Sequence, residues 1–192
     1  MNAARGAVRN ATTMTAADRR FEPLGGRTVY EGRIVTLHVE RYRYPDGEEV
    51  EREVIRHQGA VGIVAHDGTD LFLVRQPREV VGDPDFLEIP AGRLDVEGEA
   101  PLLAAQRELA EEIGKSAASW RELKHFYLTP GWADEEMTLF EATELDDAVA
   151  DPDPGERIEI VLWPLADLDG AIEQCIDAKS LIGLLMLKDH LR

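Results

Sequence analysis

The chain has 192 residues, 44% of them hydrophobic, a size that suits one well-buried domain with or without a small appended module. Its formal net charge of −17 argues against a nucleic-acid partner, because affinity for a polyanion comes largely from Lys and Arg side chains that neutralise phosphates. The chain has no run near the roughly 20 apolar residues of a membrane span, and its lone Cys175 rules out an intrachain disulfide, so we expect a soluble cytoplasmic protein.

The N-terminal region divides into a tail and a small β subdomain. Residues 1–22, rich in Ala, Thr and Arg, show no periodicity and predict a flexible tail. Apolar and polar residues alternate over 35–39, the pattern of a half-buried strand, and a second strand is expected over 50–55 after the turn at 45–47. Because a bare hairpin is marginal in water, we expect the subdomain, residues 23–57, to pack against another surface, with a second copy of the chain as the candidate.

The middle of the chain predicts a buried sheet. Residues 61–65 and 71–74 are short, continuously apolar runs, which is typical of central strands covered on both faces. Further strands are expected over 86–90, 123–128, 137–142 and 158–163, and one or two closing helices over 165–191. Strands interrupted by a helix and followed by helices indicate an α/β or α+β sandwich.

The most informative stretch is the helix expected over residues 101–113, which begins with proline and ends before Gly114. Its apolar residues recur every three or four positions and form one side. Glu108, Glu111 and Glu112 share a different flank, where three carboxylates repel one another unless a positive charge lies among them. A hard divalent cation suits such oxygen ligands. The alternative is an ordinary solvated helix face.

This stretch resembles the signature of the Nudix hydrolases, G-x5-E-x7-R-E-U-x-E-E-x-G-U, in which U is aliphatic. The matching residues are Gly92, Glu99, Arg107, Glu108, Leu109, Glu111, Glu112 and Gly114. Two departures occur: six residues rather than five separate Gly92 from Glu99, and Lys115 occupies the last aliphatic position. The extra residue falls in the loop before the helix, where insertions are tolerated, and neither departure touches an expected ligand.

Flanking segments resemble the ADP-ribose pyrophosphatase branch of that family. They include residues 52–60 (REVIRHQGA), 75–78 (RQPR) and 87–92 (LEIPAG), and Pro130 lies sixteen residues after Gly114, as in that branch. The resemblance implies an α/β/α sandwich with a mixed central sheet over residues 58–192. It also implies a small N-terminal antiparallel sheet that is shared in a homodimer.

The resemblance assigns a Mg²⁺ or Mn²⁺ site to the acidic helix. Glu108 and Glu112 are the expected metal ligands, with the backbone carbonyl of Ala91 completing the set. Glu111 is either a third ligand or the residue that holds the attacking water. Arg107 is expected to be structural, pairing with Glu99 or Glu111.

Three further residues are candidates outside the helix. By resemblance, Glu135 orients or deprotonates water from a loop across the site, although it could also belong to a polar loop tip. Arg78 is the expected cation for a substrate phosphate or ribose because its guanidinium is a rigid fork of donors; the alternative is a surface charge at a strand end. Arg52 is a weaker candidate for the nucleotide end of the substrate.

The implied activity is metal-dependent hydrolysis of ADP-ribose to AMP and ribose 5-phosphate, with Glu111, Glu112 and Glu135 as catalytic residues. Two alternatives stay open. One is hydrolysis of another nucleoside diphosphate sugar or a dinucleotide, since specificity depends on pocket shape rather than on the signature. The other is a ligand-sensing domain that binds without cutting.

Overall fold

The computed structural model describes residues 20–150, 155 and 157–192 and divides the chain into two units. The first unit ends at Arg56, and the second runs from His57 to Arg192. Of the tail predicted over residues 1–22, residues 1–19 lie outside the described residues, whereas Glu22 already belongs to a strand. Each unit has its own β-sheet.

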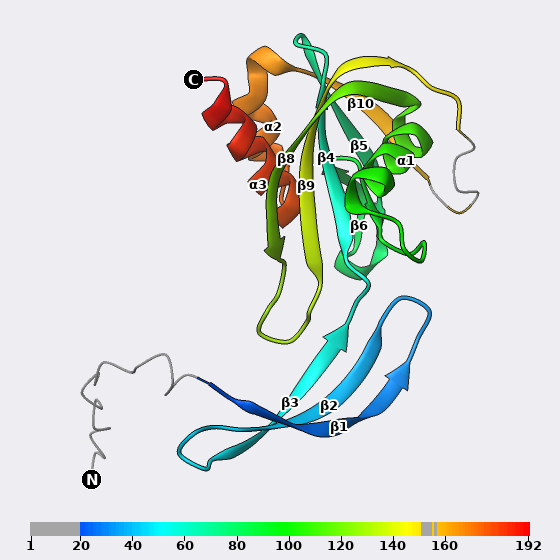
Figure 1. The fold of residues 1–192 in the computed structure, drawn as a ribbon. Helices are drawn as coiled ribbons and strands as arrows, with labels where there is room; N and C mark the ends of the chain where they lie inside the picture. Colours follow the sequence, from blue (N-terminus) through cyan, green and yellow to red (C-terminus); the bar gives the residue numbers. More distant parts are fainter. Residues whose placement is uncertain (1–19, 151–154, 156) are drawn as a thin grey trace. The chain divides into compact units, whose positions relative to one another are not determined.

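The first unit is a three-stranded antiparallel sheet of β1 (Glu22–Glu31), β2 (Thr36–Arg43) and β3 (Glu49–Arg56) (Figure 1). The sequence pattern predicts only the hairpin of β2 and β3. The pattern does not predict β1, because this strand contains a proline and two glycines, residues that are depleted in strands. Two register shifts also interrupt its pairing with β2. Its extended conformation therefore depends on hydrogen bonds to β2 rather than on its own pattern.

The second unit contains a seven-stranded sheet whose main order is β10-β5-β4-β9-β8. Two short strands extend it, since β6 pairs with β5 and β7 with β4. The strands are β4 (Ala60–His66), β5 (Asp70–Arg78), β6 (Asp83–Glu88), β7 (Ala91–Arg93), β8 (Lys115–Tyr127), β9 (Glu136–Asp147) and β10 (Glu159–Pro164). The central pair, β4 and β9, is parallel and the other pairs are antiparallel. The predicted mixed sheet is thus confirmed.

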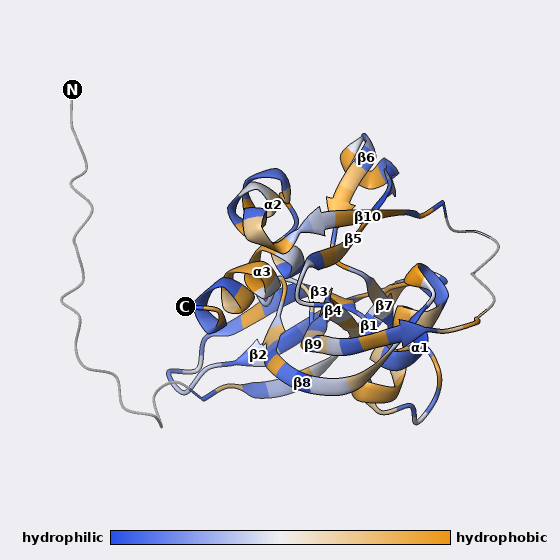
Figure 2. Cartoon of the chain, turned by 90° about the horizontal axis from the view of Figure 1, so that it is seen from above, coloured by the Kyte–Doolittle hydropathy of each residue, from blue (hydrophilic) through white to orange (hydrophobic). Residues whose placement is uncertain are grey.

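Helices cover both faces of this sheet. α1 (Pro101–Ile113) lies on one face, and α2 (Leu168–Gln174) and α3 (Ala178–His190) lie on the other (Figure 1). Two 3₁₀ turns, Glu79–Val81 and Leu165–Asp167, complete the elements. All three helices carry both hydrophilic and hydrophobic residues (Figure 2), as expected where only one side of a helix is buried. The expected α/β/α sandwich and the closing helices are confirmed.

The sheet separates two apolar cores. On the α1 face, Ile63 of β4 packs in a cluster with Leu109 and Ile113 of the helix. On the α3 face, the next residue of β4, Val64, packs in a cluster with Leu184. Because successive strand residues point to opposite faces, a continuously apolar strand such as β4 supplies both cores at once.

α1 begins and ends where the sequence predicts. Pro101 stands in its first turn, and Gly114, with φ 66°, ends it by donating its N–H to the carbonyl of Ala110 at 3.0 Å. Strand β8 then starts at once, at Lys115, rather than at the expected residue 123. Residues 115–119 at the start of β8 are small or polar, so their extended form comes from the long ladder with β9 rather than from their own alternation.

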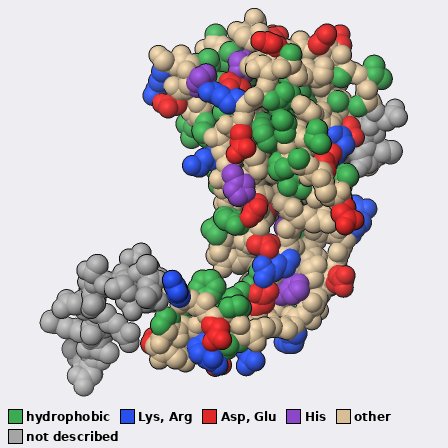
Figure 3. All heavy atoms as spheres, viewed as in Figure 1, with side chains coloured by type: hydrophobic (Ala, Val, Ile, Leu, Met, Phe, Trp, Pro, Cys, Tyr) green, Lys and Arg blue, Asp and Glu red, His purple; other side chains and the backbone are tan. Residues whose placement is uncertain are grey.

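Charge and hydropathy are distributed as in an ordinary folded domain. Asp and Glu side chains are scattered over the face shown in Figure 3, interspersed with Lys and Arg. None of the helices in the described part of the chain has the length and apolar character needed to cross a bilayer.

The buried thiol of Cys175 gives a test of the core. Burial raises the pKa of Cys175 from 9.0 to about 11, and the side chain belongs to the core on the α3 face. Because only the thiolate is nucleophilic, iodoacetamide at pH 8 should leave the native chain unlabelled and add one label after unfolding in urea. Intact mass spectrometry reads the result. Equal labelling rates in the two states would show that this part of the core is open.

Candidate active site

The acidic flank of α1 lies at the edge of the core. While Leu109 packs into the apolar cluster, Glu108 and Glu112 are themselves buried, with exposed fractions of 8% and 7%. Glu111, between them in sequence, is more open, with 30% of its side chain exposed. Two carboxylates are therefore held at fixed positions, and the third can reach solvent.

Gly92 is the point at which β7 touches this flank. A Cβ atom placed on Gly92 would lie 1.8 Å from the carboxyl carbon of Glu108, so no other residue fits there without displacing Glu108. Strand β4 fixes the position of β7 opposite the helix. β7 pairs with β4, and the N–H of Ile63 donates to the carbonyl of Pro90 at 2.8 Å. The glycine of the signature is thus a packing requirement.

Ala91, next to Gly92, contacts the second buried carboxylate. Its N–H donates to Glu112 Oε2 at 2.9 Å. The structure therefore brings together the three residues predicted as metal ligands, Ala91, Glu108 and Glu112, although the contact shown is made by the amide of Ala91. Their role as ligands stays a prediction.

Arg107 partly balances the acids. Its Nη1 donates to Glu108 at 2.7 Å and to Glu111 at 2.9 Å, while Nη2 donates to Glu99 at 3.1 Å. The hydrogen bond to Glu99, together with the charge of Glu108, raises the pKa of the Arg107 guanidinium far above its ordinary value. The predicted pairing of Arg107 with Glu99 or Glu111 is confirmed: Arg107 binds both, and its bond to Glu99 joins the loop before α1 to the helix.

The donor set fits a hard divalent cation. Among the described residues, no three His, Cys, Asp or Glu side chains converge as a ready-made cation cage. Mg²⁺ does not need one, since it binds through one or two carboxylates and completes its shell with waters and substrate phosphates. Three carboxylates, of Glu99, Glu108 and Glu111, pair with the single guanidinium of Arg107, so the cluster retains excess negative charge for a cation.

The loop that carries Glu135 is tied to the residues just before β4. Asp134 Oδ1 accepts the backbone N–H of His57 at 2.9 Å, and Glu135 Oε1 lies 4.0 Å from His57 Nδ1. Because Nδ1 accepts the N–H of Gly59 at 3.1 Å, it has no proton to give to Glu135. Glu135 is thus a partly exposed carboxylate on an anchored loop, and its catalytic role stays a prediction.

The two arginines predicted to bind substrate have different surroundings. Arg78, at the end of β5, donates its Nε to Glu88 at 2.6 Å. Burial lowers the pKa of the Arg78 guanidinium, but the hydrogen bond to Glu88 and the negative charges of Glu88 and Glu112 outweigh burial and raise it. Arg78 and Glu112 therefore share one electrostatic environment. Arg52, on β3 in the first unit, is exposed and donates to the carbonyl of Glu51 at 2.8 Å.

Sequence reasoning missed the partners of Arg78. Glu88, with only 1% exposed, binds Arg78 through one oxygen and Lys179 of α3 through the other. A signal was available, because Glu88 interrupts the apolar run Phe86–Ile89, and a buried carboxylate requires a charged or hydrogen-bonding partner. The sequence pattern could not identify this partner, because Lys179 lies 91 residues further along the chain.

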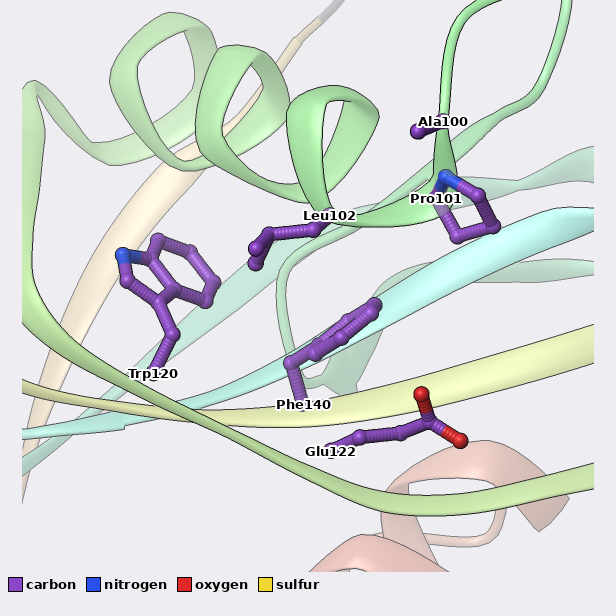
Figure 4. A pocket seen from close by; sticks show the side chains of 6 residues that line it. All are labelled: Ala100, Pro101, Leu102, Trp120, Glu122 and Phe140. Carbon is purple, nitrogen blue, oxygen red and sulfur yellow. The ribbon is translucent and has the colours of Figure 1, made fainter.

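A separate pocket of about 330 Å³ lies between the first turn of α1 and strands β8 and β9 (Figure 4). It is lined by Ala100, Pro101, Leu102, Trp120, Glu122 and Phe140. Trp120 and Phe140 meet edge to face, with ring centroids 6.2 Å apart. None of the predicted site residues lines this mostly apolar pocket.

Comparison with known proteins places this geometry in a family. The model of the NUDIX domain matches residues 56–181. An "ADP-ribose pyrophosphatase" of Mycobacterium tuberculosis is 42% identical over 130 residues, which span 67% of this chain but only 62% of that protein. An "ADP-ribose pyrophosphatase" of Bacillus subtilis is 34% identical over 171 residues, 85% of this chain and 91% of that protein. A crystal structure of an "ADP compounds hydrolase" superposes with a TM-score of 0.79 at 26% identity, covering 90% of this chain and 95% of that one.

The contact at Gly92 gives a direct test of the site. In Gly92→Ala the new methyl group collides with the Glu108 carboxylate, so we expect the affinity for Mn²⁺ to fall by at least about tenfold. Electron paramagnetic resonance of free Mn²⁺ measures the change, and circular dichroism checks the fold. Gly131→Ala is the matched control, because nothing lies within 4 Å of a Cβ at that position. Equal Mn²⁺ affinity in the two variants would contradict the assigned site.

Proposed function

The chain belongs to the Nudix family, and on this premise we propose that it hydrolyses ADP-ribose to AMP and ribose 5-phosphate. The observation that carries the proposal is the packing of Glu108 and Glu112 against Gly92 and Ala91. It provides two buried carboxylates, and the charge of one of them, Glu112, acts on Arg78, a cation that a diphosphate substrate requires. The two ADP-ribose pyrophosphatases of Mycobacterium tuberculosis and Bacillus subtilis, as relatives of this chain, support ADP-ribose as the substrate.

The metal assignment uses the acidic cluster. Glu108, Glu112 and the carbonyl of Ala91 would hold a divalent cation, Mg²⁺ or Mn²⁺. Such a cation, when bound, neutralises charge on the diphosphate and lowers the pKa of a bound water. Arg107, on the same helix, binds Glu108 and Glu111, so these carboxylates are oriented before substrate arrives.

The chemical step is attack of water on one phosphorus of the diphosphate. The water oxygen forms a bond to phosphorus, the bond from that phosphorus to the bridging oxygen breaks, and the leaving phosphate keeps the electron pair. In our assignment Glu111 orients the water and Glu135 accepts its proton. Arg78 binds a phosphate oxygen through its terminal nitrogens.

Two alternatives to ADP-ribose hydrolysis are a different nucleoside diphosphate substrate and ligand sensing without cleavage. Hydrolysis of further nucleoside diphosphate compounds is favoured by the match to an ADP compounds hydrolase. Comparison of kcat/KM over ADP-ribose, other nucleoside diphosphate sugars and dinucleotides would decide between these substrates. Tight binding of ADP-ribose without turnover, at any metal concentration, would instead indicate a ligand-sensing domain.

The proposal includes a small anionic molecule as the binding partner and the cytoplasm as the compartment. A small anionic substrate is compatible with the net charge of −17, because bound cations invert the local field, whereas a nucleic acid is not. A reducing, cytoplasmic setting is supported by the single cysteine, which is buried and has no second cysteine with which to pair.

We also propose that the protein is a homodimer assembled through the first unit. No described residue before Gly59 is buried, although Tyr30, Leu37 and Ile55 form an apolar row across β1, β2 and β3. A sheet needs a covered apolar face for stability, and Tyr30 is 61% exposed. A second copy related by a two-fold axis would cover this row and present the same row in return.

The activity is tested by incubating the purified chain with ADP-ribose and Mg²⁺ and separating the nucleotides by chromatography. We expect AMP and ribose 5-phosphate in equal amounts, and none with excess EDTA. Glu112→Gln removes charge stabilisation worth several kcal/mol, so kcat/KM should fall by about two orders of magnitude or more. Glu122→Gln, in the separate pocket, is the matched control and should retain activity. Full activity of Glu112→Gln would refute its assignment.

The assembly is tested by light scattering coupled to size exclusion at micromolar concentration. The mass should be twice the 21.4 kDa of one chain. Tyr30→Glu places a charge in the apolar row and should shift the mass to that of a monomer. Val80→Glu introduces the same charge at a fully exposed position of the second unit and should leave the dimer intact. A fully active wild-type monomer would contradict the dimer.

A further inference from the structure

A row of alternating charges links the C-terminal helix α3 to the candidate site. Its members, in order, are Arg78, Glu88, Lys179 and Asp177. Arg78 Nε donates to Glu88 Oε1 at 2.6 Å, Lys179 Nζ donates to Glu88 Oε2, and Lys179 Nζ also donates to Asp177 Oδ2 at 2.9 Å. Two positive and two negative groups therefore balance one another in a largely buried setting.

Lys179 leaves only one oxygen of the Glu88 carboxylate for Arg78. It is itself buried, and it occupies the second oxygen of the Glu88 carboxylate. Arg78 is consequently bound side-on, through Nε alone. Within residues 20–150, 155 and 157–192, its terminal nitrogens make no hydrogen bond, and 42% of the side chain is exposed. The two terminal nitrogens are thus available to an anionic ligand.

The base of Lys179 is rigid. Asp177 caps α3 by accepting the N–H of Ser180 at 3.0 Å, and it accepts the Ser180 hydroxyl at 2.5 Å. The same Ser180 Oγ accepts the N–H of Ile89 at 2.9 Å. Ile89 directly precedes Pro90, Ala91 and Gly92. The first turn of α3 is therefore fixed to the segment that approaches the acidic helix, and Lys179 has little freedom to move away from Glu88.

From these contacts we propose that Lys179 is a positioning residue for Arg78: by occupying the second oxygen of Glu88, it keeps the terminal nitrogens of Arg78 directed at a phosphate of the substrate. Without Lys179, the free oxygen of Glu88 would attract the guanidinium into a two-point pair, because a carboxylate and an arginine fork match in geometry. One phosphate-binding donor would then be lost. The inference rests on the proposed function for the identity of the ligand, a diphosphate.

A purely structural role for Lys179 predicts a different outcome. In that case its loss would lower the stability of the fold, but the folded molecules would bind the diphosphate normally. The two roles are separated by measuring ligand affinity on folded protein and by asking whether the effect requires Arg78.

The experiment measures binding of α,β-methylene ADP-ribose, whose bridge cannot be hydrolysed, by titration calorimetry with Mg²⁺ on the full chain. Lys179→Met should weaken binding by about tenfold, the loss of one charge-assisted hydrogen bond. Lys179→Arg, which keeps the charge, should stay within about threefold of wild type. In an Arg78→Ala background, Lys179→Met should change the affinity by less than about twofold, since both substitutions act on the same donor.

The control is Lys188→Met on the same helix, where an exposed ion pair to Asp169 is lost and wild-type binding is expected. Should Lys179→Met fail to fold, Glu88→Gln/Lys179→Met leaves no lone buried charge at the pair: the new amide oxygen still accepts from Arg78 Nε, but its NH2 group cannot form a second bond to the guanidinium, so binding should stay within about threefold of wild type. Wild-type affinity of Lys179→Met, a tenfold weakening in Glu88→Gln/Lys179→Met, or independent effects of Lys179 and Arg78 would overturn the inference. Formation of AMP from ADP-ribose by the wild type is scored separately, so binding that follows this pattern without cleavage would refute only the proposed activity.

Discussion

The contact between Glu108 and Gly92 is the constraint on which the site depends. A buried carboxylate lies where a side chain would normally be, so helix α1 and strand β7 approach more closely than any residue except glycine permits. Burying a carboxylate is costly unless it is hydrogen-bonded and paired. Here Arg107 pairs with Glu108, and the N–H of Ala91 binds Glu112. The fold thus holds negative charge at one place before any ligand binds.

The two faces of the sheet contribute different halves of this arrangement. The helix on one face supplies acids, and the helix on the other supplies Lys179. They meet at the segment from Glu88 to Gly92, which touches Lys179 at its start and Glu108 at its end. An anionic substrate that bridges a cation site and Arg78 would therefore depend on groups from both sides of the sandwich, with Lys179 acting through Glu88 and Arg78. Neither helix alone could provide them, because each is screened from the other by the central strands.

The sequence could predict what depends on local pattern. The ends of α1 follow from Pro101 and Gly114, and the pairing of Arg107 with Glu111 follows from their separation by one helix turn. The sequence could not predict β1, whose extended conformation depends on pairing with β2. Nor could it predict the link from Glu88 to Lys179 or from His57 to Asp134, since each joins segments more than 70 residues apart. Such pairs depend on tertiary packing and produce no periodic pattern in the sequence.

The parallel pairing of β4 with β9 has a consequence for how the molecule acquires its fold. Ala60 lies beside Met137, so the central ladder closes only after the intervening chain, including α1 and β7, has been accommodated. Contacts between residues far apart in sequence carry a large loop-closure entropy and form slowly. The acidic helix and the glycine strand lie inside that loop. Because the cluster behind α1 includes Phe140 and Ala142 of β9, the core that supports the acidic helix is complete only once this ladder has closed.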